Sequence, residues 1–405
     1  MAIDNEFSLA RKVELIKEKV YDQCPYIKKA ESYVPQSQLE GKKYGNVYTV
    51  YIPDAGQSRI AKASAGKDGL KANVKAIKQV EYQIETKAGM NDCELTEWNK
   101  LGDIGSFKKE ILNKRCINLA RTVEKEAIDS TVWEAAQVGY IGELDLDAIG
   151  LGSAGLDEAS VAGDKVTFAS PKVAAKLAKK ALGGTFICND EIAKKLYAQK
   201  YIGTYAESAV VTESLMPTIT ANSARTAAIT LVAVTAGAGE TVGFKAIKAL
   251  NEGSTAQAGD VYKLDGLKLV DVNGMETDND FYVVVGQDGK IPEIRITIKG
   301  QGFGNPNAWV ASGTEAGSKN LSYALEDGKK YSVLQTRTKE ALGFDAYEFD
   351  EIPGTEMTKD SVDALTVQVY TGGNLGDFSS LVRIVVPFAA GMPEPRNVVL
   401  SYVEV

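Results

Sequence analysis

Apolar residues recur at every third or fourth position near the N-terminus. Within residues 7–32 they are Leu9, Val13, Ile16, Val20 and Ile27, and charged residues occupy many of the positions between them. This spacing predicts a short amphipathic helix, an N-terminal arm with one apolar face. Because a helix this short cannot bury that face alone, it packs either on its own core or on a neighbouring subunit. The pattern is equally compatible with both.

Two alternating runs rich in Tyr, Val and Thr, Tyr44–Ile52 and Ile77–Thr86, predict a pair of strands. The small and charged residues between them, DAGQSRIAKASAGKDGLKAN, predict a mobile tip. Isolated hairpins are marginally stable in water, so we expect this arm to lie on another surface. Lysines of the tip allow isopeptide crosslinks to a neighbour's asparagine, although a solvated loop is favoured: Lys62, Lys67, Lys71 and Lys75.

A long helix is predicted from Phe107 to about Gln137, behind Ser106 as N-cap, because neither Gly nor Pro interrupts this stretch. About 30 residues rising ~1.5 Å each give a rod of roughly 45 Å, a structural beam. Its apolar stripe is Leu112, Cys116, Leu119, Val123 and Ala127. The charged positions assigned to its other faces are Lys108, Lys109, Lys114, Arg115, Arg121, Glu124 and Lys125.

The next segment predicts a helix, a strand and a second helix. Ser170 and Pro171 start the first helix, Gly183-Gly184 ends it, and Asn189 caps the second, which runs to about Gln199. In YIGTYAESAVVTESLMPTIT we expect Gly203 to turn the chain and Val210–Met216 to form a strand that ends at a proline.

From about residue 222 to 338 the pattern changes to short strands separated by turns. Tight hairpin turns are predicted at Asp265-Gly266, Asn273-Gly274 and Asp288-Gly289. Ile294, Ile296 and Ile298 alternate with polar residues that include Arg295, which predicts one dry and one wet face. The predicted strands are Ala227–Thr235, Val242–Leu250, Val261–Leu264, Leu267–Val272, Phe281–Gly286, Glu293–Lys299 and Tyr331–Thr336.

These strands predict an inserted β-barrel or sandwich of about 115 residues. More strands follow it, so the first domain resumes after the insertion. They are Phe344–Ile352, Ala364–Tyr370, Leu381–Phe388 and Asn397–Val403.

Composition removes several kinds of chemistry. The 405 residues are 44% hydrophobic and 25% charged, as in a globular chain, and they include no histidine. Ser-His-Asp and Cys-His nucleophiles, histidine bases and histidine metal sites are therefore excluded. The net charge of −8, with both signs interspersed, disfavours a dedicated DNA-binding face.

The cysteines and the apolar stretches indicate a cytoplasmic protein. Cys24, Cys93, Cys116 and Cys188 lack CxxC spacing, so we interpret them as reduced and buried thiols. The start MAIDNEFSLARK carries acids and no apolar segment, so no signal peptide is expected. No membrane span is expected either, because Ala227–Val234 is too short.

Three patterns suggest chemistry, and each has a simpler structural interpretation. Gly150, Gly152 and Gly155 spell GxGxxG, but we favour a flexible loop because the sequence after them predicts a loop that leads to a strand. The acids of Asp271–Asp280 do not have calcium-loop spacing, so a hairpin turn with solvated acids is favoured. The third pattern is a group of four carboxylates, for which we favour polar strand faces over the paired carboxylates of a hydrolase: Asp345, Glu348, Asp350 and Glu351. No catalytic, cofactor or metal residue is predicted.

The order of these parts resembles a tailed-bacteriophage major capsid protein of the HK97-like fold, and the inserted β-domain makes the chain most similar to the phage P22 coat protein branch. KKLYAQKYIGTYAESAVVTESLMPTIT resembles the axial-domain segment of that family, and GDFSSLVRIVVPFAAGMPEPRNVVLSYV resembles its closing strands. The implied fold class is α+β, an HK97-like capsid fold with N-arm, extended β-hairpin loop, long spine helix, axial domain and inserted all-β barrel-like domain. The implied divisions are an N-terminal arm (1–33), an extended loop (34–88), a peripheral domain with the spine helix (89–140 and 381–405), an axial domain (141–221 and 339–380) and an inserted barrel (222–338).

The resemblance implies a structural protein without cofactors that self-assembles as hexamers and pentamers into an icosahedral phage head around double-stranded DNA. It implies that the protein assembles in the cytoplasm of a bacterial host and becomes part of the virion. The implied partners are a portal and double-stranded DNA, which is packaged without sequence-specific binding. A separate scaffolding protein is expected, because no built-in scaffold segment precedes the arm. Residues expected to contact the scaffold or a neighbouring subunit are Asp4, Glu6, Glu14, Glu18, Arg59 and Lys62.

Two other functions stay open. An encapsulin-like bacterial nanocompartment shell has the same architecture and encloses enzymes. A β-rich surface adhesin is a different class, which would call for a secretion signal and a monomeric state. A carboxylate enzyme is the least favoured.

Overall fold

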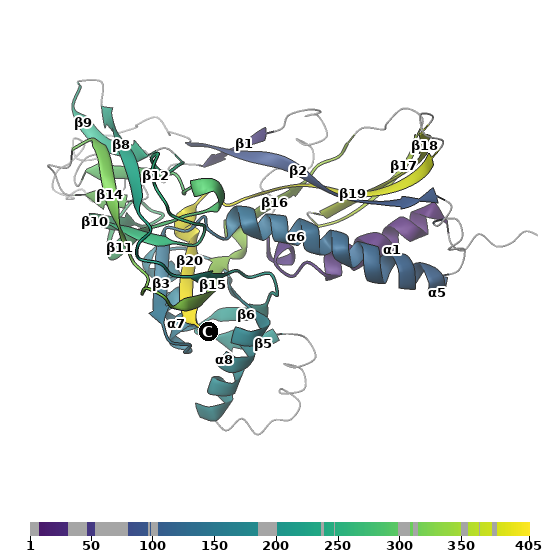
Figure 1. The fold of residues 1–405 in the computed structure, drawn as a ribbon, viewed down its shortest axis with the longest axis horizontal. Helices are drawn as coiled ribbons and strands as arrows, with labels where there is room; N and C mark the ends of the chain where they lie inside the picture. The colour runs from purple at the N-terminus through teal and green to yellow at the C-terminus, as the bar shows by residue number, and fades with distance from the viewer. Residues whose placement is uncertain are drawn as a thin grey trace, which may run out of the picture.

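The structure is a computed structural model with mixed helices and strands. It describes residues 8–30, 47–52, 80–95, 98, 104–184, 201–235, 239–246, 248–298, 308–310, 315–349, 355–363, 365–374 and 379–405. Figure 1 shows an elongated molecule with a long sheet at one end, a barrel at the other and a third lobe below their junction.

The long sheet has the strand order β1-β2-β19-β18-β17, with β16 also paired to β19. Its second strand is long enough to serve two partners. Val80–Glu85 pairs with β1, and Thr86–Glu94 pairs with β19. The predicted hairpin is therefore confirmed in its strands, and its second strand continues into the sheet. The strands are β1 (Val47–Ile52), β2 (Val80–Glu94), β16 (Gly343–Ala346), β17 (Thr355–Val362), β18 (Leu365–Asn374) and β19 (Ser379–Gly391).

The predicted beam helix exists, and it covers one face of this sheet. It consists of α5 (Ile104–Phe107), a π-helical segment η3 (Lys108–Cys116) and α6 (Ile117–Thr131) in direct succession. The N-cap predicted at Ser106 is wrong, because the helix begins at Ile104 and Ser106 lies inside it. The helix also ends earlier than predicted, at Thr131, and Gln137 begins a strand. Gly89 of β2 lets the helix approach closely, since a Cβ there would lie 2.4 Å from Val123 Cγ2.

The N-terminal arm packs on its own chain. It contains α1 (Leu9–Asp22), whose Ser8 cap accepts a hydrogen bond from Arg11 N–H, and the 3₁₀ turn η1 (Ile27–Lys29). Val13, Ile16 and Val20 are fully buried. The helix contacts β17, β18, η3 and α6. The sequence left two alternatives open, packing on its own core or on a neighbouring subunit, and in the structure the arm packs on its own core.

The central sheet has the order β3-β20-β15-β4-β6-β5, and β7 also pairs with β15. Its helices α7 (Asp147–Glu158) and α8 (Pro171–Gly184) form the lower lobe with β5 and β6 (Figure 1). The strands are β3 (Gln137–Gly142), β4 (Lys165–Ala169), β5 (Tyr201–Tyr205), β6 (Ser208–Thr212), β7 (Thr218–Thr220), β15 (Lys330–Thr338) and β20 (Val398–Glu404). The short 3₁₀ turns η5 (Lys339–Ala341) and η6 (Pro395–Asn397) precede β16 and β20.

The turn expected at Gly203 is wrong. Gly203 lies inside β5, and the chain turns at Ala206 and Glu207, which have φ values of 48° and 65°. The strand expected at Val210–Met216 is β6, which begins and ends earlier, at Ser208 and Thr212. The helix predicted from Pro171 to Gly184 is confirmed, and the one predicted after Asn189 lies outside the described residues.

The inserted β-domain contains a closed six-stranded barrel. The ring β10-β13-β12-β9-β8-β14 closes because β14 pairs with both β8 and β10, and β11 adds to β10 outside the ring. The strands are β8 (Ala227–Thr235), β9 (Thr241–Ala246), β10 (Val261–Val270), β11 (Glu276–Val284), β12 (Ile294–Ile298), β13 (Ala308–Val310) and β14 (Gly317–Tyr323). The 3₁₀ turn η4 (Gln287–Gly289) follows β11.

Three details of this domain differ from the prediction. The hairpin turn at Asp265-Gly266 is wrong, because β10 continues through it with a register shift. Arg295 is buried at 5% exposure, so the wet face expected on β12 is wrong at this position. The strand predicted at Tyr331–Thr336 is β15, which pairs with β20, β4 and β7 of the central sheet.

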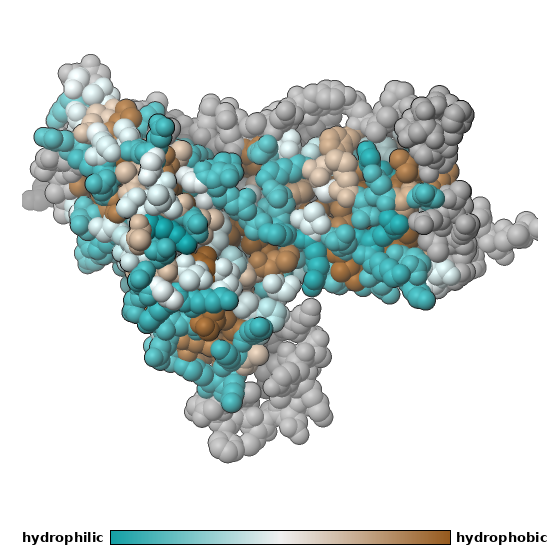
Figure 2. All heavy atoms as spheres, viewed as in Figure 1, coloured by the Kyte–Doolittle hydropathy of each residue, from teal (hydrophilic) through white to brown (hydrophobic). Residues whose placement is uncertain are grey.

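Hydrophobic side chains form three buried clusters, one beneath the long sheet and beam helix, one in the barrel and one around α7 and α8. On the face shown in Figure 2, hydrophilic side chains predominate and hydrophobic ones appear in small separate areas. Most of the hydrophobic side chains that these clusters contain therefore lie inside the fold, between its helices and sheets, and not on this face.

Candidate functional site

The described residues contain no cluster of three or more His, Cys, Asp or Glu side chains arranged to hold a metal ion. Cys24, Cys93 and Cys116 are reduced and buried, as predicted, and Cys188 lies outside the described residues. No described helix is both long and apolar enough to span a membrane.

The predicted contact residues are only partly within the described structure. Asp4, Glu6, Arg59 and Lys62 lie outside it, as do Lys67, Lys71 and Lys75 of the loop tip. Glu14 forms an exposed ion pair with Arg11 at 2.5 Å on α1, and Glu18 is exposed on the same helix. The structure does not bring these acids into a site with other groups.

The glycines of GxGxxG lie in α7, so the flexible loop predicted for them is wrong. Gly152 and Gly155 allow close packing of this helix on the central sheet. A Cβ on Gly152 would lie 2.7 Å from Thr336 Oγ1, and one on Gly155 would lie 3.1 Å from Gln137 Oε1. The glycines therefore serve the packing of α7, and the residues provide no phosphate-binding loop between a strand and a helix.

The predicted hairpin turn after β10 is confirmed, but Asp271 within it is not solvated. Its side chain is buried and accepts hydrogen bonds from Ser160 Oγ at 2.8 Å and from the backbone N–H groups of Asn273 and Met275. Its backbone carbonyl accepts one from Arg396 Nη1 at 2.6 Å. Asp271 thus joins the barrel to the end of α7 and to the segment before β20.

The second set of carboxylates is dispersed. Asp345 is buried in β16, and Glu348 forms an ion pair with Lys359. Asp350 and Glu351 lie outside the described residues. Of the described members, one is therefore buried in a strand and the other forms an exposed ion pair.

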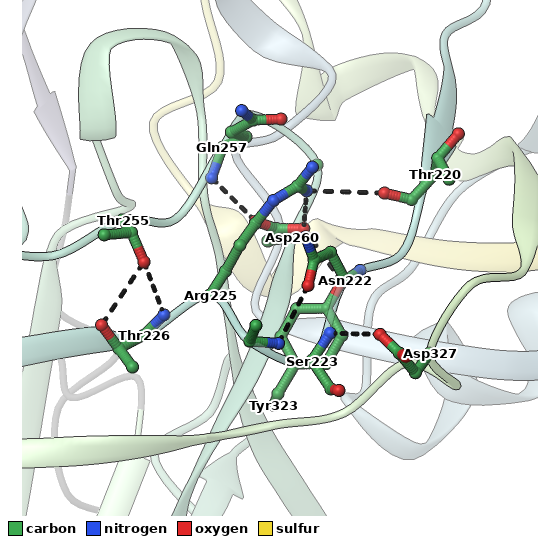
Figure 3. A network of polar contacts seen from close by, with 12 residues as sticks. Thr220, Asn222, Ser223, Arg225, Thr226, Thr255, Gln257, Asp260, Tyr323 and Asp327 are labelled. Atoms are coloured by element: carbon green, nitrogen blue, oxygen red, sulfur yellow. Dashed lines mark hydrogen bonds and ion pairs between the residues drawn. The ribbon is translucent and has the colours of Figure 1, made fainter.

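A network of polar contacts lies at the root of the barrel, where the chain enters and leaves it (Figure 3). Its centre is Asp260, which is fully buried just before β10. One carboxylate oxygen accepts hydrogen bonds from Arg225 Nη1 at 2.9 Å and from the Tyr323 hydroxyl at 3.0 Å. The other accepts from Gln257 N–H at 2.7 Å. A buried carboxylate needs this compensation, because losing its hydration is costly.

The same network ties the entering chain to the leaving chain. Asn222 N–H donates to the Tyr323 hydroxyl at 3.0 Å, and Ser223 N–H donates to Asp327 Oδ1 at 2.7 Å. Burial raises the pKa of Tyr323 to about 12, and the hydrogen bonds from Ser223 lower the pKa of Asp327. Near neutral pH Tyr323 therefore stays protonated and Asp327 stays ionised. The network thus holds the entering and leaving segments together without depending on pH in this range.

A pair of carboxyl groups is buried elsewhere in the core. Glu124 of α6 and Glu213, just after β6, are 1% and 3% exposed, and the two side chains lie close enough to interact. Burial, and then the charge of Glu213, raise the pKa of Glu124 to about 9. Sequence reasoning missed this pair by assigning Glu124 to a charged helix face. Its only signal was a carboxylate one position after Val123 of the apolar stripe.

No protein-family model matches the chain, and no curated protein matches it either. Similar solved structures include the capsid of cyanophage P-SCSP1u, with 12% identity, a TM-score of 0.40 and coverage of 93% of this chain and 86% of that one. The mature capsid of bacteriophage PhiM1 has 9% identity and a TM-score of 0.41, over 93% and 86%. A virus-like particle from Pyrococcus furiosus has 10% identity and a TM-score of 0.36, over 96% and 97%. These low scores assign no role to any residue.

Proposed function

We propose that this chain is the major capsid protein of a tailed bacteriophage with an HK97-like fold of the P22 type. In this proposal it is non-enzymatic and assembles as hexamers and pentamers into an icosahedral head. The observation that carries the proposal is the two-stranded ribbon of β1 and Val80–Glu85. Each of these segments has the other as its only strand partner among the described residues.

Such a ribbon gains little stability alone, because two strands bury little apolar surface. Repeated copies of the chain would supply the missing surface, with each square ångström of apolar contact contributing ~25 cal/mol. Modest contacts are sufficient in a closed shell, since each subunit makes several of them.

The proposal divides the chain into the parts of a capsid subunit. Residues 1–33 are the N-arm, residues 34–88 the extended loop, and residues 89–140 with 381–405 the peripheral domain, in which α5, η3 and α6 are the spine helix. Residues 141–221 with 339–380 are the axial domain, and residues 222–338 the insertion domain. We count β15 with the host, because it pairs with β20 and β4.

The partners follow from the same proposal. A separate scaffolding protein and a portal would take part in assembly in the bacterial cytoplasm, and double-stranded DNA would fill the finished head. A net charge of −8 supports DNA packing without adhesion, since a negative wall repels phosphates.

The test is to excise the ribbon. A variant in which a short Gly-Ser linker replaces residues 47–85 keeps the segment of β2 that pairs with β19. We expect it to fold, as judged by circular dichroism, and to form no closed shells by electron microscopy with the candidate scaffold. Shells formed at the yield of the full chain would overturn the proposal. Particles that form around an enzyme instead of DNA would favour the nanocompartment.

A further inference from the structure

The turn that ends the N-terminal arm covers the buried carboxyl pair. Glu124 Oε1 accepts a hydrogen bond from the backbone N–H of Tyr26 at 2.7 Å. Tyr26 and its neighbour Ile27 are themselves buried. The arm therefore contributes a backbone donor to a carboxyl group of the spine helix and separates that group from solvent.

The other carboxyl of the pair belongs to the central lobe. Glu213 accepts a hydrogen bond from Leu215 N–H at 2.8 Å, in the turn that follows β6. Two carboxylates in contact without water repel each other strongly, so such a pair is stable when it shares one proton. With that proton, Glu124 donates to Glu213 and still accepts from the arm.

The turn of residues 26–29, which ends the arm, is also held by an arginine of the central sheet. Arg337 of β15 is fully buried and donates to the carbonyl oxygens of Tyr26 at 3.1 Å and Lys29 at 2.6 Å. Its guanidinium lies 4.7 Å from the centre of the Tyr26 ring. Farther out, α1 is tied to the β17–β18 hairpin by Lys17 with Asp360 and by Tyr21 with Asp363.

We propose that the arm is a latch kept closed by the proton that Glu124 and Glu213 share, and that loss of this proton opens the arm while both sheets stay folded. The arm can separate without breaking a strand pairing, whereas β6 is hydrogen-bonded between β4 and β5 and α6 packs on β2 and β19. Opening admits water to the two carboxylates and relieves their repulsion. The proton passes to solvent hydroxide, and no other reactant is needed.

The other titratable and charged groups near Glu124 either also disfavour its ionisation or are held by partners of their own. Burial and the two glutamates raise the pKa of the neighbouring Cys24 thiol. Lys28 on the arm pairs with Asp22 at 3.0 Å, and Arg337 faces Tyr26. The charged neighbours of Glu124 on its own helix are exposed: Arg121 and Lys125.

Hydrogen exchange of the full, unassembled chain tests the latch. We would measure exchange in peptides that cover residues 9–30 between pH 7.5 and 10, corrected for the intrinsic pH dependence of amide exchange. Because the pKa of Glu124 is raised to about 9 in the closed state, the closed form loses stability as pH rises toward 9, by up to about tenfold per pH unit, and no further above it. We therefore expect protection of the arm to fall more than tenfold between pH 7.5 and 9 and to level off by pH 10, with protection of β18 and β19 retained.

Two variants separate the latch from general alkaline loosening. Glu124→Gln keeps an acceptor for the arm and donates to Glu213 without a titrating proton, so the arm should stay protected at pH 10. Glu126→Gln, on the same helix but paired with Lys87 outside this cluster, should behave like the unaltered chain. The latch would be overturned if protection of residues 9–30 did not change with pH in the unaltered chain. It would also be overturned if Glu124→Gln lost as much protection as the unaltered chain. Neither result depends on shell formation, so the proposed function is tested separately.

Discussion

The Arg225 guanidinium lies 2.9 Å from the Asp260 carboxylate, which is fully buried at the root of the barrel (Figure 3). Arg225 belongs to the segment by which the chain enters the barrel, and Asp260 immediately precedes β10. Their contact fixes the start of β10 against the segment that enters the barrel.

Replacing Arg225 with methionine should lower the free energy of unfolding by about 3 kcal/mol, because it leaves a buried carboxylate without its counter-charge. The urea midpoint of the full chain measures this loss. Lys245→Met, at an exposed position of β9, is the matched control and should change stability by less than about 0.5 kcal/mol. Equal effects of the two changes would show that the ion pair does not hold the root together.

Gly259 allows the barrel to meet the host domain closely. Its φ is +91°, and a Cβ there would lie 2.5 Å from Ile219 Cγ2 and 2.9 Å from the Trp133 ring. Gly253 has a similar φ of +86° but no neighbouring atom within 4 Å. The two positions share backbone strain and differ in packing.

Gly253→Ala should therefore cost about 1–2 kcal/mol through its backbone alone. Gly259→Ala should cost about 2 kcal/mol more, because it also overpacks a junction. Thermal and urea unfolding of both variants check the difference. If the two costs are equal, the close contact at Gly259 is not a determinant of stability.

The glycines of α7 provide a second matched pair with opposite expected signs. A Cβ at Gly150 would meet Tyr205 at an ordinary 3.7 Å, whereas at Gly152 it would lie 2.7 Å from Thr336 Oγ1. That hydroxyl is hydrogen-bonded to Thr167 at 2.9 Å and has little freedom to move.

Gly150→Ala should raise the free energy of unfolding by about 0.5–1 kcal/mol, since glycine weakens a helix interior. Gly152→Ala should lower it by about 1–3 kcal/mol through overpacking. Urea unfolding distinguishes the signs. Stabilisation by both changes would mean that α7 is not held close to the sheet by its glycines.

Local patterns predicted much of the fold because they report local physics. Ala227–Thr235 was predicted as a strand and is β8 with the same ends, and the helix from Pro171 to Gly184 is bounded as predicted. The turn at Ala206 and Glu207 was not predictable in this way, because neither residue favours a positive φ. The same holds for β10, where Asp265-Gly266 has turn chemistry but strand pairing continues through it.

The candidate sites depended on contacts between distant segments, which the sequence pattern does not reveal. Glu124 is buried because residues near position 26, nearly a hundred positions away, cover it. Asp271 is likewise buried by Ser160 and Arg396 rather than by its own turn. The arm also packs on its own chain, so deleting residues 1–30 removes core contacts as well as any neighbour contacts.

The pKa of Glu124 also predicts how global stability depends on pH. Its pKa is raised from 4.5 to about 9 in the folded chain, so the folded state binds more protons than the unfolded state between these values. Stability contributed by this group is therefore fully present below about pH 4.5 and is lost as pH rises toward 9, by up to about 1.4 kcal/mol per unit.

Between pH 7.5 and 9, Glu124→Gln should accordingly gain about 1–2 kcal/mol in free energy of unfolding relative to the unaltered chain. Burial also raises the pKa of Glu134 to about 7, but that group is present in both chains and cancels in the difference. Urea unfolding at three pH values in this window measures the trend, with Glu126→Gln as the control that should show none. A difference independent of pH would mean that Glu124 does not hold its proton in the folded chain, and the latch would lose its physical basis.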